Sequence, residues 1–427
     1  MVEYLFLSTN LYDNSNPCTE TFSALAPGHR ASACVKLKLV NRLSDMQKHI
    51  PPTDELIAWL RISQEPDLGA AQARNLLAAC GLPQDIYAMS ASALGKLLPE
   101  PLVRQLRQPP GEALQQRLDA TLAWLEQPGH HLLTLADPAY PQKLLDIHDP
   151  PLVLYVNGDV SLLNAPSLAM VGSRNPTAGG IDNATAFARH LAGQGWCIVS
   201  GLAQGIDAAA HQGALAAGNS GGRTVAIMGT GIDIVYPAGN RQLAHQIAAD
   251  GALVTEFPLG AKAQPYSFPR RNRIVAGLCQ GVLVVEAARQ SGSLITARLA
   301  GESGREVFAI PGSIHSPLSR GCHALIRQGA KLVESASDIL EDLGSTSLDQ
   351  APPKQISSTR PATAQAAQAL PPETQRVLDA MGYDPVDVDM LLTRTALEVS
   401  QINQQLLTLE LQDYIVRQND GRFMRRR

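Results

Sequence analysis

The sequence lacks any run of eighteen apolar residues, which is roughly the length that a helix needs to cross a bilayer. Its opening residues contain neither a basic segment nor a long apolar one, which is not typical of a secretory signal peptide. We therefore expect a cytoplasmic protein without a membrane partner.

Closely spaced cysteines are also missing. The six cysteines of the chain are scattered, and no Cys-x-x-Cys pair occurs. Scattered cysteines indicate free thiols in a reducing compartment rather than a disulfide framework or a zinc site. We expect neither a metal nor a cofactor.

The chain also lacks an excess of basic residues. The formal net charge is -4, whereas nucleic-acid-binding proteins usually carry a surplus of lysine and arginine. Composition alone therefore gives no reason to expect DNA as a ligand. If the protein binds DNA, its positive charge has to be concentrated locally.

The first two segments of the chain differ in pattern. Residues 1–45 are irregular and rich in Ser, Asn and Thr, and we expect them to be an extension, with translation starting at Met46. Native protein whose N-terminal sequence begins at Met1 would contradict this. Residues 46–129 contain short apolar clusters at helical spacing, which predict a small helical domain. It is either of the SAM or helix-hairpin-helix kind or a docking module without a ligand.

Residues 130–343 show short β-rich runs that alternate with amphipathic stretches. This alternation is typical of a parallel sheet covered by helices on both faces, with right-handed crossovers. The fold class is therefore α/β. The predicted strands are 168–171, 197–199, 225–228, 253–255, 282–285 and 307–310.

The last two segments are a linker and a small domain. Residues 344–371 have almost no large apolar side chains and cannot bury a core, which predicts a linker. Residues 372–427 predict three helices and a hairpin, with Thr395 and Glu398 as a capping box at the third helix. This order suggests a winged-helix-like domain, and such a domain binds either duplex DNA or another protein.

The first candidate site is Gly172, Ser173 and Arg174, which follow a predicted strand and precede a helix around 182–192. Glycine lets a phosphate approach the backbone, and the helix start offers free N–H groups and a positive dipole end. Arg174 adds a bidentate phosphate donor at the carboxyl end of a strand, where open α/β sheets bind ligands. A tight turn with a surface arginine is the alternative interpretation.

A second turn contains Ser200, Gly201 and Gly205 and again joins a strand to a helix. It predicts a second anion-binding turn. Asp207 and His211 stand four residues apart on the helix, so their side chains share a face. A catalytic pair would need a nucleophile, and none stands within reach in the sequence, so a pair that fixes the helix is favoured.

A third segment holds Phe268 and three arginines, Arg270, Arg271 and Arg273, at the apparent start of a helix that begins at Ile274. Arginine at a helix start opposes the helix dipole unless an anion binds there. Phe268 and a neighbouring tyrosine stand beside the arginines, and aromatic rings next to a basic groove are typical of single-strand binding. The segment predicts an anionic ligand, with a solvated charge run as the alternative.

Two further turns follow predicted strands. Ser291, Gly292 and Thr296 lead into a helix, and residues 310–313 end the next strand. Because the carboxyl ends of parallel strands meet at one edge of a sheet, these turns should converge on one rim. That convergence is more specific than any single motif.

Taken together, these motifs resemble the bacterial DNA-processing protein A family, also called Smf, from about residue 140 to residue 340. The resemblance implies an extended Rossmann fold and a homodimer formed through that domain. It implies binding of incoming single-stranded DNA without sequence preference, which would protect that DNA. It also implies loading of the RecA recombinase onto the strand during natural transformation. The matching segments are Gly172-Ser173-Arg174, 200–211, 268–273 and 291–297.

The resemblance also assigns residues. Arg174 matches an arginine that the family uses on DNA, and residues 271–273 match its Arg-Asn-Arg segment. Some members place a lysine where this chain has Pro265, and Lys262 is the nearest lysine. The candidate DNA-binding residues are Gly172, Ser173, Arg174, Ser200, Gly201, Gly205, Lys262, Phe268, Arg270, Arg271, Asn272, Arg273, Ser291, Gly292 and Thr296.

The main rival is an enzyme, a nucleotide phosphoribohydrolase of related fold, whose PGGxGTxxE segment carries a functional glutamate. This chain has no glutamate at the comparable turn, but Glu256 and Glu286 lie near strand ends. A dinucleotide-dependent oxidoreductase lacks support because no GxGxxG follows the first strand of the sheet. A scaffold that binds a partner protein through the winged helix is compatible with the main interpretation. We favour a DNA-binding protein that is not an enzyme, with the hydrolase as the alternative.

Overall fold

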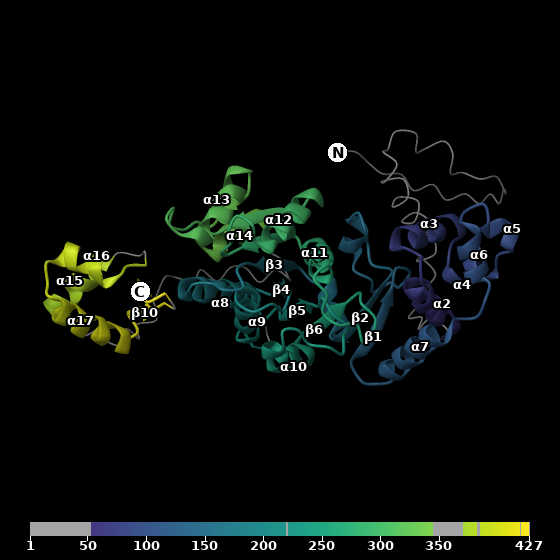
Figure 1. Cartoon of the computed structure of the whole chain (residues 1–427), viewed down its shortest axis with the longest axis horizontal. Coiled ribbons are helices and arrows are strands. Elements are labelled where there is room, and N and C mark those ends of the chain that lie inside the picture. The colour runs from purple at the N-terminus through teal and green to yellow at the C-terminus, as the bar shows by residue number, and fades with distance from the viewer. Residues whose placement is uncertain (1–52, 219–220, 345–369, 382–384, 419, 427) are drawn as a thin grey trace, which may run out of the picture. The chain divides into compact units, whose positions relative to one another are not determined.

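A computed structural model gives the structure of the protein (Figure 1). The chain splits into two compact units, Met1–Pro109 and Pro110–Arg427. The expected extension over residues 1–45 and nearly all of the expected linker over residues 344–371 lie outside the described residues. The structure describes residues 53–218, 221–344, 370–381, 385–418 and 420–426.

The first unit consists of short helices around a small apolar core. Trp59, Leu60 and Ile62 of the first helix are buried. Glu65 is buried beside them, and its carboxylate accepts hydrogen bonds from Arg61 (3.2 Å) and from Gln105 (2.9 Å), which satisfies the buried charge. The helices are α2 (Thr53–Gln64), α3 (Ala70–Cys80), α4 (Pro83–Ala88), α5 (Ala91–Leu94) and α6 (Glu100–Leu106).

The second unit contains a nine-stranded sheet, counted over the described residues, in the order β1-β2-β6-β5-β4-β3-β7-β8-β9. The seven neighbouring strands β6, β5, β4, β3, β7, β8 and β9 are parallel to one another. Strands β1 and β2 add an antiparallel edge next to β6. The strands are β1 (His130–Thr134), β2 (Val153–Gly158), β3 (Ser167–Val171), β4 (Cys197–Ser200), β5 (Thr224–Ile227), β6 (Ala252–Thr255), β7 (Gly281–Val284), β8 (Glu306–Ala309) and β9 (Lys331–Leu332).

The prediction of a largely parallel α/β sheet is confirmed, since each of the six predicted strands overlaps one of β3 to β8. The antiparallel edge was missed. Strand β2 is an apolar run that no helical repeat follows, so the alternation of strand and helix does not reveal it. Its four leading residues are buried, and β1 and β6 pair with it on its two edges.

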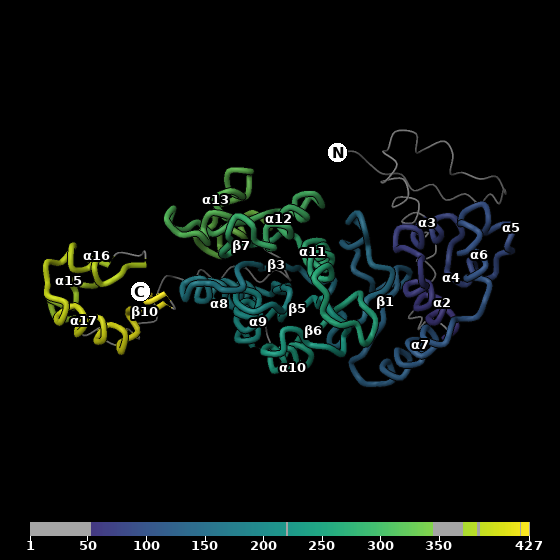
Figure 2. The backbone as a smooth tube through the Cα atoms, viewed as in Figure 1, coloured from purple at the N-terminus to yellow at the C-terminus, as the bar shows by residue number. Residues whose placement is uncertain are grey.

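Helices cover both faces of this sheet (Figures 1 and 2). On one face, α8 and α9 share a buried apolar cluster with β3, β4 and β7 that includes Phe187, Trp196 and Phe308. Helices α11 and α12 pack against each other and against the strands on the other face. The helices are α7 (Glu112–Leu125), α8 (Ala178–Gly193), α9 (Ile206–Leu215), α10 (Arg241–Asp250), α11 (Ser267–Leu278), α12 (Gly292–Glu302), α13 (Arg320–Arg327) and α14 (Ala336–Leu343).

Strand β3 is the point where the strand order reverses. From β3 the chain proceeds through β4, β5 and β6 on one side, and then returns to place β7, β8 and β9 on the other side. In open α/β sheets, a crevice opens at the carboxyl ends of the two strands that flank such a reversal. Here these strands are β3 and β7, which directs attention to the loops after Val171 and Val284.

The C-terminal residues form a winged helix, as predicted. Its helices bury an apolar cluster that includes Val377, Leu391 and Ile402. The predicted capping box was wrong: Glu398 is the N-cap of α17, and its partner is Gln401. The elements are α15 (Pro372–Met381), α16 (Val388–Thr395), α17 (Val399–Leu411), β10 (Ile415–Arg417) and β11 (Phe423–Arg425).

The wrong capping partner was Thr395, which ends α16. Its hydroxyl donates a hydrogen bond to the carbonyl oxygen of Leu391 at 2.6 Å. The Thr-x-x-Glu spacing therefore spans the end of one helix and the start of the next. Across the described residues, no helix is both long enough and apolar enough to span a membrane.

Candidate nucleic-acid interface

A pocket of about 760 Å³ opens at the carboxyl ends of the parallel strands, between the loop after β3 and the starts of α11 and α12. We call it the rim pocket. It combines residues from the connections that follow five strands, β3 to β7, as expected for the edge where the parallel strands end. The predicted residues that line it are Gly172, Arg174, Phe268, Arg271, Asn272, Ser291, Gly292 and Thr296.

The remaining predicted residues lie elsewhere. Lys262 is exposed and does not line the rim pocket, although Ala263, Gln264 and Pro265 do. The other predicted residues that are not part of its lining are Ser173, Ser200, Gly201, Gly205, Arg270 and Arg273.

Arg174 and two aromatic rings form one side of the rim pocket. Arg174 is exposed, and its guanidinium carbon lies 5.8 Å from the centroid of the Phe268 ring. The Tyr236 ring lies 5.4 Å from the Phe268 ring, tilted by 42°. Arg174 forms no ion pair with any residue that the structure describes, so its charge is available to a ligand.

Tyr236 was missed from the sequence. It lies in the loop after β5, far in sequence from every predicted motif. It nevertheless lines the rim pocket, and 52% of its surface is exposed. A large aromatic side chain that stays half exposed beside an arginine is available for stacking on a base. The only sequence signal was an aromatic residue, followed by proline, in a loop after a predicted strand.

The start of α8 is occupied by a carboxylate of the protein itself. Glu286, just after β7, accepts hydrogen bonds from the Thr177 backbone N–H at 2.9 Å and from the Thr177 hydroxyl at 2.6 Å. Thr177 is the N-cap of α8, and its hydroxyl oxygen accepts from the N–H of Gly180. A negative charge at a helix start is favourable. Glu286 therefore takes the position where the sequence predicts a phosphate.

The turn after β4 is satisfied internally as well. Asp207, in the first turn of α9, accepts hydrogen bonds from the backbone N–H groups of Gly201 (3.2 Å) and Ala203 (3.3 Å). The Ser200 hydroxyl donates to the Met170 carbonyl oxygen at 2.6 Å. Burial raises the pKa of the Asp207 carboxyl, and Arg271 and the two N–H groups act in the opposite direction. The donors that the sequence assigned to an anion are thus bound to Asp207.

Gly205 has a structural reason to be glycine. Its φ is +83°, a conformation that side chains with a Cβ rarely adopt. A Cβ at this position would also collide with the carbonyl oxygens of Ser173 and Arg174. Gly205 therefore lets the turn before α9 lie directly against the loop that carries Arg174.

Arg271 lies on the floor of the rim pocket rather than at its mouth. It is only 5% exposed, and its Nη1 donates to the Ile227 carbonyl oxygen at 2.5 Å. Gly201 makes room for the guanidinium, because a Cβ there would collide with it. Burial lowers the pKa of Arg271, and the Asp207 carboxylate raises it. Arg271 therefore supplies positive charge that is already balanced by a buried carboxylate.

His211 does not form the pair with Asp207 that its spacing allows. Its Nδ1 lies 2.7 Å from the Thr224 hydroxyl, which itself donates to the Ile198 carbonyl oxygen. Because that hydroxyl has a single proton, Nδ1–H must be the donor in the first bond. Burial, reinforced by the charge of Arg271, lowers the pKa of His211 to about 3. His211 is therefore a neutral, buried imidazole at physiological pH.

The arginines of α11 lie one turn further into the helix than predicted. The helix begins at Ser267 rather than Ile274, because proline is tolerated in the first helical turn. Arg270 and Arg273 both bind the same Glu256 oxygen, at 3.0 Å and 2.6 Å. Both are thus already paired with a carboxylate, and the expected conflict with the helix dipole is absent.

The start of α12 differs from the starts of α8 and α9. Ser291 is its N-cap and accepts from the Ser293 N–H at 3.3 Å, and the first turn contains no acidic residue. Asn272 of α11 contacts the Gly292 carbonyl oxygen through its amide at 3.5 Å. Ser291, Gly292 and Asn272 all line the rim pocket. The positive end of this helix is therefore not neutralised by an acidic residue of its own first turn.

No metal-binding cluster accompanies this pocket. Within the part of the chain that the structure describes, no three His, Cys, Asp or Glu side chains are grouped so as to hold a metal ion. The chemistry that the rim pocket offers is therefore that of Arg174, two aromatic rings, amide and hydroxyl groups, and a helix start.

Comparison with known protein families gives two matches. Residues 131–344 match the family model of DNA recombination-mediator protein A, which covers all of the sheet except the first residue of β1. Residues 361–421 match the model of the DprA winged helix domain.

Individual relatives agree with these matches. Protein Smf of Escherichia coli (strain K12) is 43% identical over 305 residues, which is 70% of this chain and 79% of the relative. The DNA processing protein DprA of Streptococcus pneumoniae is 46% identical over 209 residues, 49% of this chain and 73% of the relative. The X-ray structure of DNA processing protein A from Streptococcus pneumoniae superposes with a TM-score of 0.54 at 36% identity, covering 69% of this chain and 99% of that one.

Proposed function

The chain belongs to the DNA recombination-mediator protein A family, and from that membership we propose that it binds single-stranded DNA in the rim pocket without sequence preference. The bound strand is the DNA that is processed in natural transformation and homologous recombination. In this proposal Arg174 binds a backbone phosphate, while Phe268 and Tyr236 stack on bases. The remaining lining residues shape the pocket.

The observation that carries this proposal is the unpaired Arg174 beside two neighbouring aromatic rings, those of Phe268 and Tyr236. A cation that tracks phosphates, next to aromatic faces that accept any base, is the chemistry of sequence-tolerant single-strand binding. Bases in a duplex are already stacked on one another, so they are not available to Phe268 and Tyr236. The pairing of these groups therefore favours single strands over duplex DNA.

The carboxylates near the strand ends support binding without catalysis. Glu286 is held by two hydrogen bonds to Thr177, and Glu256 by Arg270 and Arg273. A general acid or base needs to reach a proton of the substrate, and these carboxylates are engaged elsewhere. Glu286 also stands at the start of α8, where a dinucleotide pyrophosphate binds in Rossmann folds. The proposal is thus a binding protein rather than a nucleotide phosphoribohydrolase.

Two partners belong to the same proposal. They are the RecA recombinase, loaded onto the bound strand, and a second copy of the chain, joined through the Rossmann-like domain. Loading of RecA is measured by the rate of RecA filament formation on single strands coated with a single-strand-binding protein, with and without this chain. Dimer formation is measured by analytical ultracentrifugation of the full chain.

The proposal is tested by fluorescence anisotropy of labelled single- and double-stranded oligonucleotides over a salt series. We expect preference for the single strand and an affinity that falls with salt, with a slope of roughly 0.7 per phosphate contacted. Arg174→Ala should weaken binding to all sequences alike. Arg189→Ala is the matched control, because Arg189 is exposed on α8 and does not line the rim pocket.

Two results would contradict the proposal. Equal affinity for both DNA forms would move the DNA site to the winged helix. Release of a base from nucleoside monophosphates, lost on Glu286→Gln, would return the phosphoribohydrolase to first place.

A further inference from the structure

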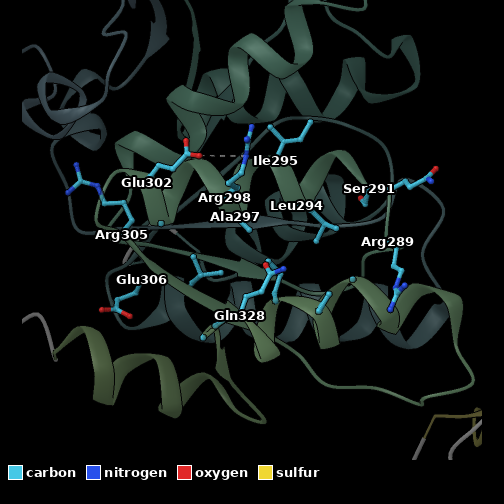
Figure 3. A pocket seen from close by; sticks show the side chains of 18 residues that line it. Arg289, Ser291, Leu294, Ile295, Ala297, Arg298, Glu302, Arg305, Glu306 and Gln328 are labelled. Carbon is cyan, nitrogen blue, oxygen red and sulfur yellow. Dashed lines mark ion pairs between the residues drawn. The ribbon is translucent and has the colours of Figure 1, made fainter. Parts of the chain in front are cut away.

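A second cavity, of about 810 Å³, lies between α12, α13 and β8 (Figure 3). We call it the α12–α13 pocket. Ser291 and Ile295 line both this cavity and the rim pocket. The two cavities therefore adjoin at the N-terminal turn of α12, so a strand that leaves the rim pocket over this turn next reaches the second cavity.

We propose that the α12–α13 pocket binds the nucleotide next to those held in the rim pocket, so that the single strand passes over the start of α12. This inference rests on the proposed function. It adds a subsite, with Arg289 as its phosphate ligand, that the sequence motifs do not indicate.

The two ends of the α12–α13 pocket carry opposite charges. Arg289 and Ser291 stand together at one end, and Glu302 and Glu306 lie at the other (Figure 3). Arg289 is exposed and forms no ion pair with any described residue, and the first turn of α12 has no acidic residue. The end that joins the rim pocket is therefore the electropositive one, which a phosphate requires.

The other cations of the pocket are already paired. Arg298 lies 3.8 Å from Glu302, one turn along α12. Arg305 lies 3.5 Å from Asp146 and also donates to the Lys143 carbonyl oxygen. With two carboxylates and two paired arginines, the far end offers no site for a further phosphate. The subsite therefore holds one nucleotide near Arg289 and does not extend the track along α12.

The walls suit a base. Leu294 and Ala297 of α12 and Leu325 of α13 line it, and Gln328, just after α13, adds its side-chain amide (Figure 3). An amide both donates and accepts hydrogen bonds, so Gln328 can serve any base. The volume lies within the range of about 300–1,000 Å³ for cavities that hold small ligands. No aromatic residue lines this pocket, so its base is held less tightly than those stacked on Phe268 and Tyr236.

The test is the affinity of the full chain for labelled oligo(dT) of increasing length, from two to twelve nucleotides, at fixed low salt. Wild type and Arg289→Ala are compared, with Arg327→Ala as control, because Arg327 is exposed on α13 and lines neither pocket. We expect equal affinities for the shortest oligonucleotides that bind. Beyond one threshold length, we expect Arg289→Ala to bind about fivefold to tenfold more weakly and to lose roughly 0.7 from its salt slope.

A second variant guards against an indirect effect. Ala324→Trp places an indole in the α12–α13 pocket without changing its charge, and it should reproduce the loss at the same threshold length. An Arg289→Ala curve that matches wild type at every length, or that is shifted equally at all lengths, would overturn the subsite. If Arg174→Ala still weakens binding in that case, the proposed function stands; if wild type binds no oligonucleotide, the proposed function itself fails.

Discussion

The rim pocket and the winged helix are both candidates for DNA contact, yet their surfaces differ in charge. At the rim, Arg174 is unpaired beside the Phe268 ring and the half-exposed ring of Tyr236. In the winged helix, α17 corresponds to the helix that enters the major groove in related DNA-binding folds. This helix contains no lysine or arginine, and its exposed positions include Val399, Leu407 and Leu411.

The arginines of the hairpin that follows α17 are largely engaged. Arg422 pairs with Asp420 at 2.6 Å, and Arg425 lies 3.9 Å from Asp379. Arg417 lies over the Phe423 ring, 5.7 Å from its centroid. Phosphate contact dominates the affinity of DNA-binding proteins. A fold associated with DNA therefore does not by itself identify the DNA-binding surface, which depends on where unpaired cations lie.

Charge reversal is the strongest test of this comparison. Arg174→Glu should lower single-strand affinity by about 100-fold or more, because an ionic contact worth about 1.5–3 kcal/mol is replaced by repulsion. Arg417→Glu in the winged helix should change it by less than about threefold. Anisotropy titrations of the two variants at one salt concentration provide the measurement. Similar losses in both would erase the distinction between the two regions.

The aromatic part of the rim predicts a smaller effect. Tyr236→Ala should weaken single-strand binding roughly tenfold, since stacking contributes about 1–3 kcal/mol per base. Tyr266→Ala is the matched control, because Tyr266 is 67% exposed and does not line the rim pocket. Oligonucleotides that carry 2-aminopurine report stacking directly, through quenched fluorescence that Tyr236→Ala should relieve. Equal affinities for the two alanine variants would remove Tyr236 from the site.

The two regions should also respond differently to mild acid. The pKa of His211 is about 3 in the folded protein and has its ordinary value of 6.5 in the unfolded chain. Between these two pH values, the unfolded chain therefore binds a proton at His211 that the folded chain does not bind. The stability that a neutral His211 gives is complete above pH 6.5 and is lost as the pH falls toward 3, at up to about 1.4 kcal/mol per pH unit. The winged helix contains no histidine, so it has no loss of stability from this cause.

Urea unfolding at pH 7 and pH 5 measures this difference. Tryptophan fluorescence in a Trp59→Phe background reports the sheet, because the remaining tryptophans, Trp124 and Trp196, are buried in the second unit and the winged helix contains none. His211→Asn should lower the unfolding free energy at pH 7 and flatten its dependence on pH. His245→Asn, an exposed histidine on α10, should leave both unchanged. A pH dependence that survives His211→Asn in full would assign it to other groups.

The smallest expected effect is a gain of binding. Asn403 and Gln404 are exposed on α17, and changing both to lysine supplies the cations that this helix lacks. Duplex affinity should rise by about threefold to tenfold, with a steeper salt dependence. The same pair changed to glutamate is the control and should give no rise. If the lysine variant does not bind duplex DNA more tightly than wild type, charge is not what separates α17 from the rim.

Much of the site was predictable from local patterns. Strand–turn–helix alternation located β3 to β8, and the turns after β3 and β7 were expected at one edge because parallel strands end together. Gly172, Arg174, Phe268 and Ser291 do line one pocket. The roles of the other arginines were not predictable in the same way. Whether a guanidinium is free depends on the carboxylates that face it, and these come from distant segments.

The α/β class, the winged helix and the turns that meet at the rim follow from hydrophobic periodicity, glycine positions and chain order, so they could be predicted from the amino-acid sequence. Which charges are unpaired depends on how the folded chain brings distant segments together. The tertiary structure sets Glu286 at the start of α8, Asp207 against the turn after β4 and Glu256 between two arginines. A carboxylate neutralises the donors that it contacts in space, whatever their distance along the chain. Arg174 is therefore a cation of the rim that stays free for a ligand, although it looks no different in sequence from Arg273.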